Sequence, residues 1–223
     1  METRALIEDL AAAATPIRPL GAPWRRTALW LAISIPYVGL LVSIHLAGID
    51  AATRIDLHLA VEQTAILLTA LTAAIAAFSS VVPGRDRRIG LLPLLPLTLW
   101  LASLGEGCLH DWLMLGSGGL QLRADWHCAQ LAVMLGVLPA IVMVVMLRRG
   151  APLLPHVTLA LGALAVAALV NFGLRIFHIG DISIMVLVWH VGGTALLSAF
   201  AGALSRYVLN WRSVLARSRR YAH

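Results

Sequence analysis

The chain has 223 residues, of which 60% are hydrophobic and only 13% charged, and its mean hydropathy is +0.85. This composition excludes an ordinary water-soluble domain and indicates a membrane protein. The formal net charge is +6, but no motif that reads a nucleic-acid groove accompanies it. We therefore attribute the charge to membrane topology and to attraction by anionic lipid, and expect no direct binding of nucleic acid.

The first 26 residues precede the apolar part of the chain. Leu6, Ile7 and Leu10 follow helical spacing, acidic residues occupy other faces, and Thr15 and Pro16 end the pattern. The segment is therefore predicted to form a short amphipathic helix followed by a proline-rich strap, which suits a docking peptide for a protein partner. The alternative is a helix that lies on the membrane surface.

Six apolar runs are long enough to cross a hydrocarbon core of about 30 Å as helices of roughly 20 residues. They cover residues 27–47, 57–82, 89–108, 126–147, 153–176 and 182–205. The predicted fold is therefore an all-α polytopic membrane protein, with a six-helix bundle over residues 27–205 and a basic tail over 206–223. Four prolines fall inside these spans and predict kinks, namely Pro36, Pro93, Pro96 and Pro139.

The arginines predict the orientation of the bundle, because positive residues stay on the cytoplasmic side of short loops. With the N-terminus inside, fourteen of the 17 basic residues are cytoplasmic, and only Arg54, Arg123 and Arg175 face outward. Both termini are therefore expected in the cytoplasm.

Two polar clusters flank the loop between the third and fourth spans: "GEGCLHDW" at residues 105–112 and "ADWHC" at residues 124–128. Cys108 is expected to end the third span and Cys128 to begin the fourth, so both face the oxidising side of the membrane, where a disulfide is one reading. With His110 and His127 they also offer two sulfur and two nitrogen ligands for zinc or copper. Their spacing fits compact structural zinc motifs poorly, so a transient metal or oxidant contact is the other reading, and no constitutive cofactor is expected.

Further polar residues lie at the same depth and form a predicted intramembrane cluster. Its members are His58, Glu62, Glu106, Arg175, His178, Asp181 and His190. Because ionisable groups inside a membrane are costly, each should have a partner, and Glu62 with Arg175 is the pair we expect. The alternative is that these residues only hold the helices together.

The distribution of these residues separates the possible functions. Apart from His156, every ionisable residue within the spans lies in the outer half, which argues against a transporter or channel with a polar site at the midplane. A thiol-redox membrane enzyme is disfavoured because two cysteines are too few for a relay, and no hydrolase motif occurs. We expect a protein without enzymatic activity that receives a stimulus outside, with close helix packing at Gly162 and Gly202.

Five segments of the sequence resemble those of a known protein family. They are "LIEDLAAAATPIRPLGAPWRR", "LWLASLGEGCLHDW", "DWHC", "LRRGAP" and "LRIFHIGD...VLVWHVGG". Together, and in this order over nearly the whole chain, they resemble the NrsF-like family of negative regulators of sigma-F, six-helix anti-sigma factors of the proteobacterial inner membrane.

The resemblance implies a regulator that holds an extracytoplasmic-function (ECF) sigma factor at the membrane through its N-terminal segment. In this chain, the expected sigma-factor-binding residues are Leu6, Ile7, Leu10, Pro16, Arg18 and Pro19. It further implies release of that factor under heavy-metal or related envelope stress, with Cys108 and Cys128 needed for the response. His178 and His190 match positions of the family motifs. The expected partners are thus a cytoplasmic ECF sigma factor and membrane lipid.

Overall fold

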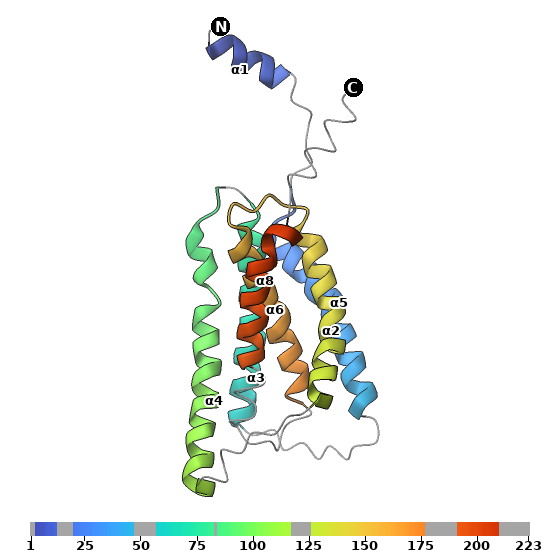
Figure 1. Ribbon diagram of the computed structural model, residues 1–223, viewed down its shortest axis with the longest axis vertical. Helices are drawn as coiled ribbons and strands as arrows, with labels where there is room; N and C mark the ends of the chain where they lie inside the picture. Colours follow the sequence, from blue (N-terminus) through green and yellow to red (C-terminus); the bar gives the residue numbers. More distant parts are fainter. Residues whose placement is uncertain are drawn as a thin grey trace.

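The computed structural model describes residues 3–12, 20–46, 57–82, 84–116, 126–176 and 191–209, and all regular secondary structure in these ranges is helical. The elements are α1 (Thr3–Ala12), α2 (Pro23–Leu46), α3 (Leu57–Ser80), the 3₁₀ helix η1 (Arg87–Leu91), α4 (Leu94–Leu115), α5 (Trp126–Leu147), α6 (Pro155–Leu174) and α8 (Gly193–Val208). Figure 1 shows α2 to α6 and α8 side by side, with successive helices antiparallel and α1 beyond one end. We call the end where α2, α4 and α6 begin the proximal end, and the opposite end the distal end.

Within the described residues, five helices are long and apolar enough to cross a membrane. They cover Pro23–His45, Leu57–Ser80, Arg88–Met114, Ala129–Leu147 and Pro155–Leu174. Of the sixth expected span, 182–205, the residues up to 190 lie outside the described residues, and the rest forms the shorter apolar helix Gly193–Ser205. The all-helical fold is confirmed, and five of the expected spans are candidates by length and composition, while the sixth span stays a prediction.

The third span differs from the expected range of 89–108. The carboxylate of Asp86 accepts a hydrogen bond from the Arg88 backbone and begins η1, and Pro93 then forms the N-cap of α4. Pro93 and Pro96 therefore lie at the start of α4, where missing backbone donors cost little, rather than inside a helix as expected. At its other end α4 continues to Leu115.

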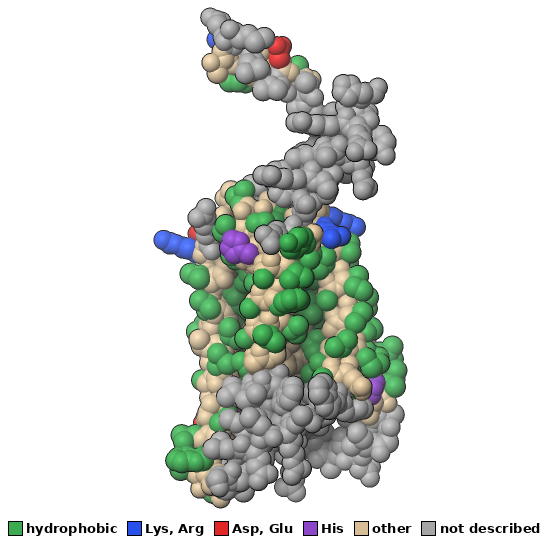
Figure 2. Space-filling model, viewed as in Figure 1, with side chains coloured by type: hydrophobic (Ala, Val, Ile, Leu, Met, Phe, Trp, Pro, Cys, Tyr) green, Lys and Arg blue, Asp and Glu red, His purple; other side chains and the backbone are tan. Residues whose placement is uncertain are grey.

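The centre of the bundle is the packing of α6 against α3, α5 and α8, while α4 packs against α3. Small side chains allow the helices to approach closely: a Cβ on Gly162 would lie 3.0 Å from Leu147 of α5, and one on Gly202 would lie 3.4 Å from the His156 carbonyl oxygen. Close packing at these two glycines was expected from the sequence. Figure 2 shows the resulting apolar surface along the bundle, with arginine side chains near the proximal end.

Candidate functional site

The ion pair expected between Glu62 and Arg175 is present near the distal end. Glu62 lies in the second turn of α3 and is fully buried, and Arg175 directly follows α6. The Arg175 Nε–H donates to both carboxylate oxygens of Glu62 at 3.0 Å. Because Glu62 is fully buried and Arg175 is only 8% exposed, their pairing offsets part of the cost of burying both charges, and the pair joins α3 to α6.

One turn before Arg175, Asn171 extends the polar contacts to α8. Its side-chain amide donates to the Thr194 hydroxyl at 2.8 Å, and both residues are buried. Asn171 and Arg175 thus share one face of α6, as their spacing predicted. The third residue of that predicted stripe, His178, lies outside the described residues, as do Asp181 and His190.

His58 and Glu106 connect α3 to α4. The His58 Nε2 atom lies 3.5 Å from the Glu106 carboxylate and 3.1 Å from the Ser103 carbonyl oxygen. His58 and Glu62 are one turn apart on α3, yet His58 faces α4 while Glu62 faces α6. This pair is more exposed than the first, with side-chain exposures of 38% and 74%. His110, one turn beyond Glu106, is exposed.

The two cysteines lie on different helices toward the distal end. Cys108 was expected to end its span but is half-buried within α4, which continues for about two more turns. Cys128 is the third residue of α5; its side chain and that of His127 lie outside the described residues. Figure 1 shows α4 at one edge of the bundle and α5 toward the other, with α3, α6 and α8 between them.

A metal centre was one interpretation of the two clusters that contain Cys108, His110, His127 and Cys128. In the described part of the chain, no group of three or more His, Cys, Asp or Glu side chains is arranged to hold a metal ion. Cys108 and His110 belong to that part, whereas the side chains of His127 and Cys128 do not, so their predicted contribution is not tested.

Below the distal polar groups, α3 has a mainly apolar buried face. Between Glu62 and Phe78 its buried residues are Ala, Ile and one threonine, Thr69. The Thr69 hydroxyl donates to the Ala65 carbonyl of its own helix at 2.8 Å and so presents no unpaired hydrogen to its neighbours. On α3, the one buried charged residue is thus Glu62 at the distal end.

A buried charge at the proximal end was not predicted from the sequence. Arg26 was assigned to the cytoplasmic surface, but it lies in the first turn of α2 and is only 7% exposed. Its Nη2 donates to the Met146 carbonyl near the end of α5, and its guanidinium lies 4.7 Å from the centre of the Phe78 ring of α3. The spacing of Arg26 to Trp30 and Ser34, both buried and each one turn further, was the signal that could have found it.

The N-terminal helix lies where the sequence predicted one. It is α1, with exposed Ile7 on its surface and an Arg4–Glu8 ion pair at 3.5 Å. Residues 13–19, which include Pro16, Arg18 and Pro19, lie outside the described residues, and so do the side chains of Leu6 and Leu10.

These observations define a helical membrane protein with paired polar groups near one end and a separate amphipathic helix at the other. The family model "Negative regulator of sigma F" (NrsF) matches residues 10–211. The chain therefore belongs to the NrsF family, which is described as a family of negative regulators of a sigma factor. No curated protein and no solved structure matches the chain significantly.

Proposed function

We propose that this protein is an anti-sigma factor of the bacterial inner membrane that holds an ECF sigma factor through its N-terminal segment. The observation that carries this proposal is the family match over residues 10–211, which names a negative regulator of a sigma factor. A sigma factor is cytoplasmic, so the segment that binds it has to be cytoplasmic too.

The positions of the described arginines support this orientation. Those in the loops and helix ends at the proximal end are Arg25, Arg26, Arg85, Arg88, Arg148 and Arg149, whereas Arg175 is near the distal end. By the positive-inside rule the proximal end faces the cytoplasm, which brings α1 to the side of the sigma factor. The distal polar groups then face the periplasm.

The helix α1 suits the docking role because its exposed apolar side chain has no place in the bundle. Ile7 is 60% exposed, and Glu8 and Asp9 beside it disfavour adsorption of the helix to an anionic leaflet. An amphipathic helix of this kind binds by burying its apolar face in a groove of its partner.

For the periplasmic side, we propose that Cys108 and Cys128 detect metal or oxidant stress. Because α4 and α5 lie at different edges of the bundle, a metal ion captured by both thiolates favours an arrangement in which α4 has moved toward α5. A change from almost complete binding of the sigma factor to almost complete release requires about 5.5 kcal/mol of such preference. Contact between His58 and Glu106 passes the displacement of α4 to α3.

The docking role is tested by binding of the full-length protein in nanodiscs to purified ECF sigma factors of the source bacterium. Replacing Ile7 by Asp removes an apolar contact, so Ile7→Asp is expected to weaken binding about tenfold or more. The matched control is Ala12→Asp, which adds the same charge on the opposite face of α1 and is expected to leave the affinity nearly unchanged. Equal loss in both variants, or no binding by the wild type, would contradict the proposal.

The sensing role is tested by metal or oxidant challenge of the same complex. Cys108→Ser and Cys128→Ser are each expected to bind the sigma factor as the wild type does before the challenge and to retain it afterwards. Normal release by Cys128→Ser would disprove sensing by the cysteine pair without affecting the docking proposal.

A further inference from the structure

Within the described residues, three side chains of α2 donate hydrogen bonds to backbone carbonyl oxygens of α5. The donors are the Arg26 guanidinium, the Trp30 indole N–H and the Tyr37 hydroxyl, and the acceptors, in the same order, are the carbonyls of Met146, Pro139 and Met134. The Trp30 bond is 3.0 Å long and the Tyr37 bond is 2.6 Å long. We call this row of three hydrogen bonds the α2–α5 seam.

The seam follows one face of α2 over much of the membrane. Its donors are four and then seven residues apart, a spacing that keeps them on the same face of a helix. From Arg26 to Tyr37 they span about 16 Å at 1.5 Å per residue, roughly half of a hydrocarbon core of about 30 Å. Because there is little hydrophobic driving force between helices in a membrane, hydrogen bonds and close packing decide how two helices are held together. The seam therefore ties the position of α2 to that of α5.

The seam connects the two parts of the chain to which the proposed function assigns detection and docking. Cys128 is the third residue of α5 at the distal end, and the last turn of α5 holds Arg26 at the proximal end. Arg26 is also the last residue of the N-terminal segment, so its position fixes where that segment leaves the bundle. Figure 1 shows α2 and α5 next to each other and antiparallel, and the two helices pack together. A displacement of α5 thus reaches the docking segment through one neighbouring helix.

The contact at the proximal end of the seam is incompletely paired. The Arg26 Nη1 atom is buried and has no hydrogen-bond partner among the described residues. An unpaired donor that is shielded from water is costly, so this contact stabilises the closed seam less than a fully paired guanidinium would. The seam is therefore able to open.

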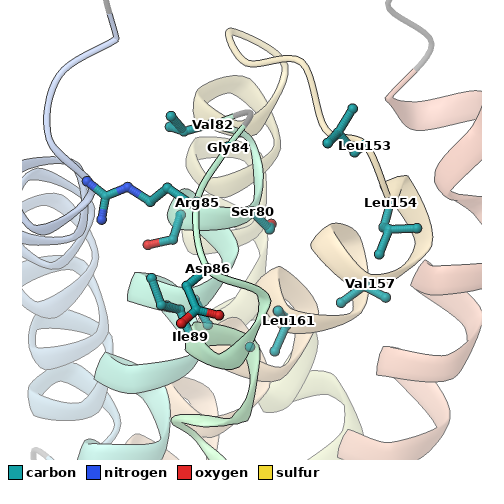
Figure 3. Close-up of a pocket in the computed structure, with 13 residues that line it drawn as sticks. Ser80, Val82, Gly84, Arg85, Asp86, Ile89, Leu153, Leu154, Val157 and Leu161 are labelled. Carbon is teal, nitrogen blue, oxygen red and sulfur yellow. The ribbon is translucent and has the colours of Figure 1, made fainter.

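The loop that follows α5 has space to move. It is joined to α3 by a hydrogen bond of 3.2 Å from the Ala151 N–H to the Val81 carbonyl. Beyond this bond it borders a cavity of about 120 Å³. Figure 3 shows Leu153 and Leu154 on one side of the cavity and Ile89 of η1 on the other. Because this space is not filled by side chains, the loop can follow a displacement of α5.

From these observations we infer that the α2–α5 seam is a latch that positions the docking segment and opens as a unit when α5 is displaced. When it is closed, Arg26 stays at the end of α5 and the segment is in the position that binds the sigma factor; when it is open, the start of α2 is free to move. Arg26, Trp30 and Tyr37 are thus positioning residues, since they act through the segment that precedes them. The inference rests on the proposed function for the role of the segment, and it adds to the contact of α4 with α3 a second connection between the distal end and Arg26.

The latch is tested by the reaction of arginine side chains with phenylglyoxal in the full-length protein in nanodiscs, measured by mass spectrometry. Arg26 is buried and Arg25 is exposed, so Arg26 is expected to react much more slowly, because it first has to leave the seam. If the seam opens as a unit, loss of the remote Tyr37 hydrogen bond makes every opening easier. Tyr37→Phe is therefore expected to speed the reaction of Arg26 about threefold, the effect of one average hydrogen bond between membrane helices, and to leave Arg25 unchanged.

The matched control is Ser43→Ala, which also removes one hydroxyl from α2. The Ser43 hydroxyl donates to the Gly39 carbonyl of its own helix at 2.7 Å, so its loss should leave the reaction of Arg26 unchanged. Equal effects of Tyr37→Phe and Ser43→Ala would show that α2 frays locally at its start, and the latch would be disproved. Reaction of Arg26 as fast as that of Arg25 in the wild type would disprove it as well.

The link to docking is measured by the same reaction with bound sigma factor. Since coupled equilibria act reciprocally, a saturating amount of sigma factor is expected to keep the latch closed and to slow the reaction of Arg26 relative to that of Arg25. The ratio of the two rates separates this effect from simple shielding of the surface by the partner. An unchanged ratio would overturn the role of the latch in docking. Absence of sigma-factor binding would instead contradict the proposed function, and the comparison of Tyr37→Phe with Ser43→Ala would still decide whether the seam opens as a unit.

Discussion

Replacing Glu62 by Gln should destabilise the bundle strongly. Glu62 is fully buried and accepts two hydrogen bonds of 3.0 Å from the Arg175 Nε–H, so the variant leaves a buried guanidinium without its counter-charge. Loss of one partner of a buried ion pair costs about 3–5 kcal/mol, of which most is the penalty of the remaining charge. We expect a loss near 3 kcal/mol, because Gln keeps one acceptor oxygen.

The assay is reversible unfolding of the full-length protein in mixed micelles, followed by circular dichroism, in a double-mutant cycle. Arg175→Met alone should also destabilise the protein, whereas Glu62→Gln with Arg175→Met removes both charges and should lie within about 1–2 kcal/mol of the wild type. The comparison with the double variant separates the penalty of losing the counter-charge from a general packing defect.

The matched control is the second ion pair at the same end. His58 and Glu106 are partly exposed, so Glu106→Gln should cost less than about 1 kcal/mol. If Glu62→Gln and Glu106→Gln had similar effects, or if the effects of Glu62→Gln and Arg175→Met were simply additive, the two buried charges would not depend on each other and the reasoning would be wrong.

Two further predictions concern packing and are measured by the same unfolding assay. A Cβ on Gly150 would lie 2.4 Å from the Cβ of Val81, so Gly150→Ala should cost about 1–3 kcal/mol, whereas Gly105→Ala, with open space around it in α4, should be neutral or stabilising. Trp30 is fully buried and its indole N–H donates to a carbonyl of α5 at 3.0 Å, so Trp30→Phe should cost about 1–3 kcal/mol. The exposed Trp24 serves as its control, and equal effects of Trp24→Phe and Trp30→Phe would show that the hydrogen bond and the burial contribute nothing.

The pairing of Glu62 with Arg175 could be predicted from the sequence because a charge inside the membrane is costly without a partner, and few residues of opposite charge are available. Both residues fall in apolar runs near the same end, they have opposite charge, and each needs a partner. The contact between His58 and Glu106 could not be predicted in this way. It depends on how α3 and α4 are rotated about their axes, and the weakly amphipathic sequences of both helices do not specify that rotation.

Two other features, the start of α4 and the burial of Arg26, could not be predicted from the sequence, for physical reasons. The start of α4 depends on the capping of η1 by Asp86, which moves the helix past Pro93, while hydropathy alone extends the span back to residue 89. Arg26 resembles the other arginines that follow the positive-inside rule. Only the approach of α5 and α3 encloses it, since the carbonyl that accepts its hydrogen bond, that of Met146, is distant in the chain.

In the proposed mechanism, α3 is the element that joins the two ends of the molecule. At the distal end it contacts α4 through His58 and α6 through Glu62, and at the proximal end its Phe78 ring lies beneath Arg26. Arg26 is the last residue of the N-terminal segment, so a shift of α3 along or about its axis would change the position of the chain that leads to the docking helix. A packed helix moves between discrete positions rather than deforming gradually, which suits a two-state release.

Such a route requires energetic coupling between its ends. A double-mutant cycle of Glu106→Gln with Arg26→Gln, measured by sigma-factor affinity, would detect this coupling as a non-additive effect. Strict additivity would mean that α3 does not carry the signal.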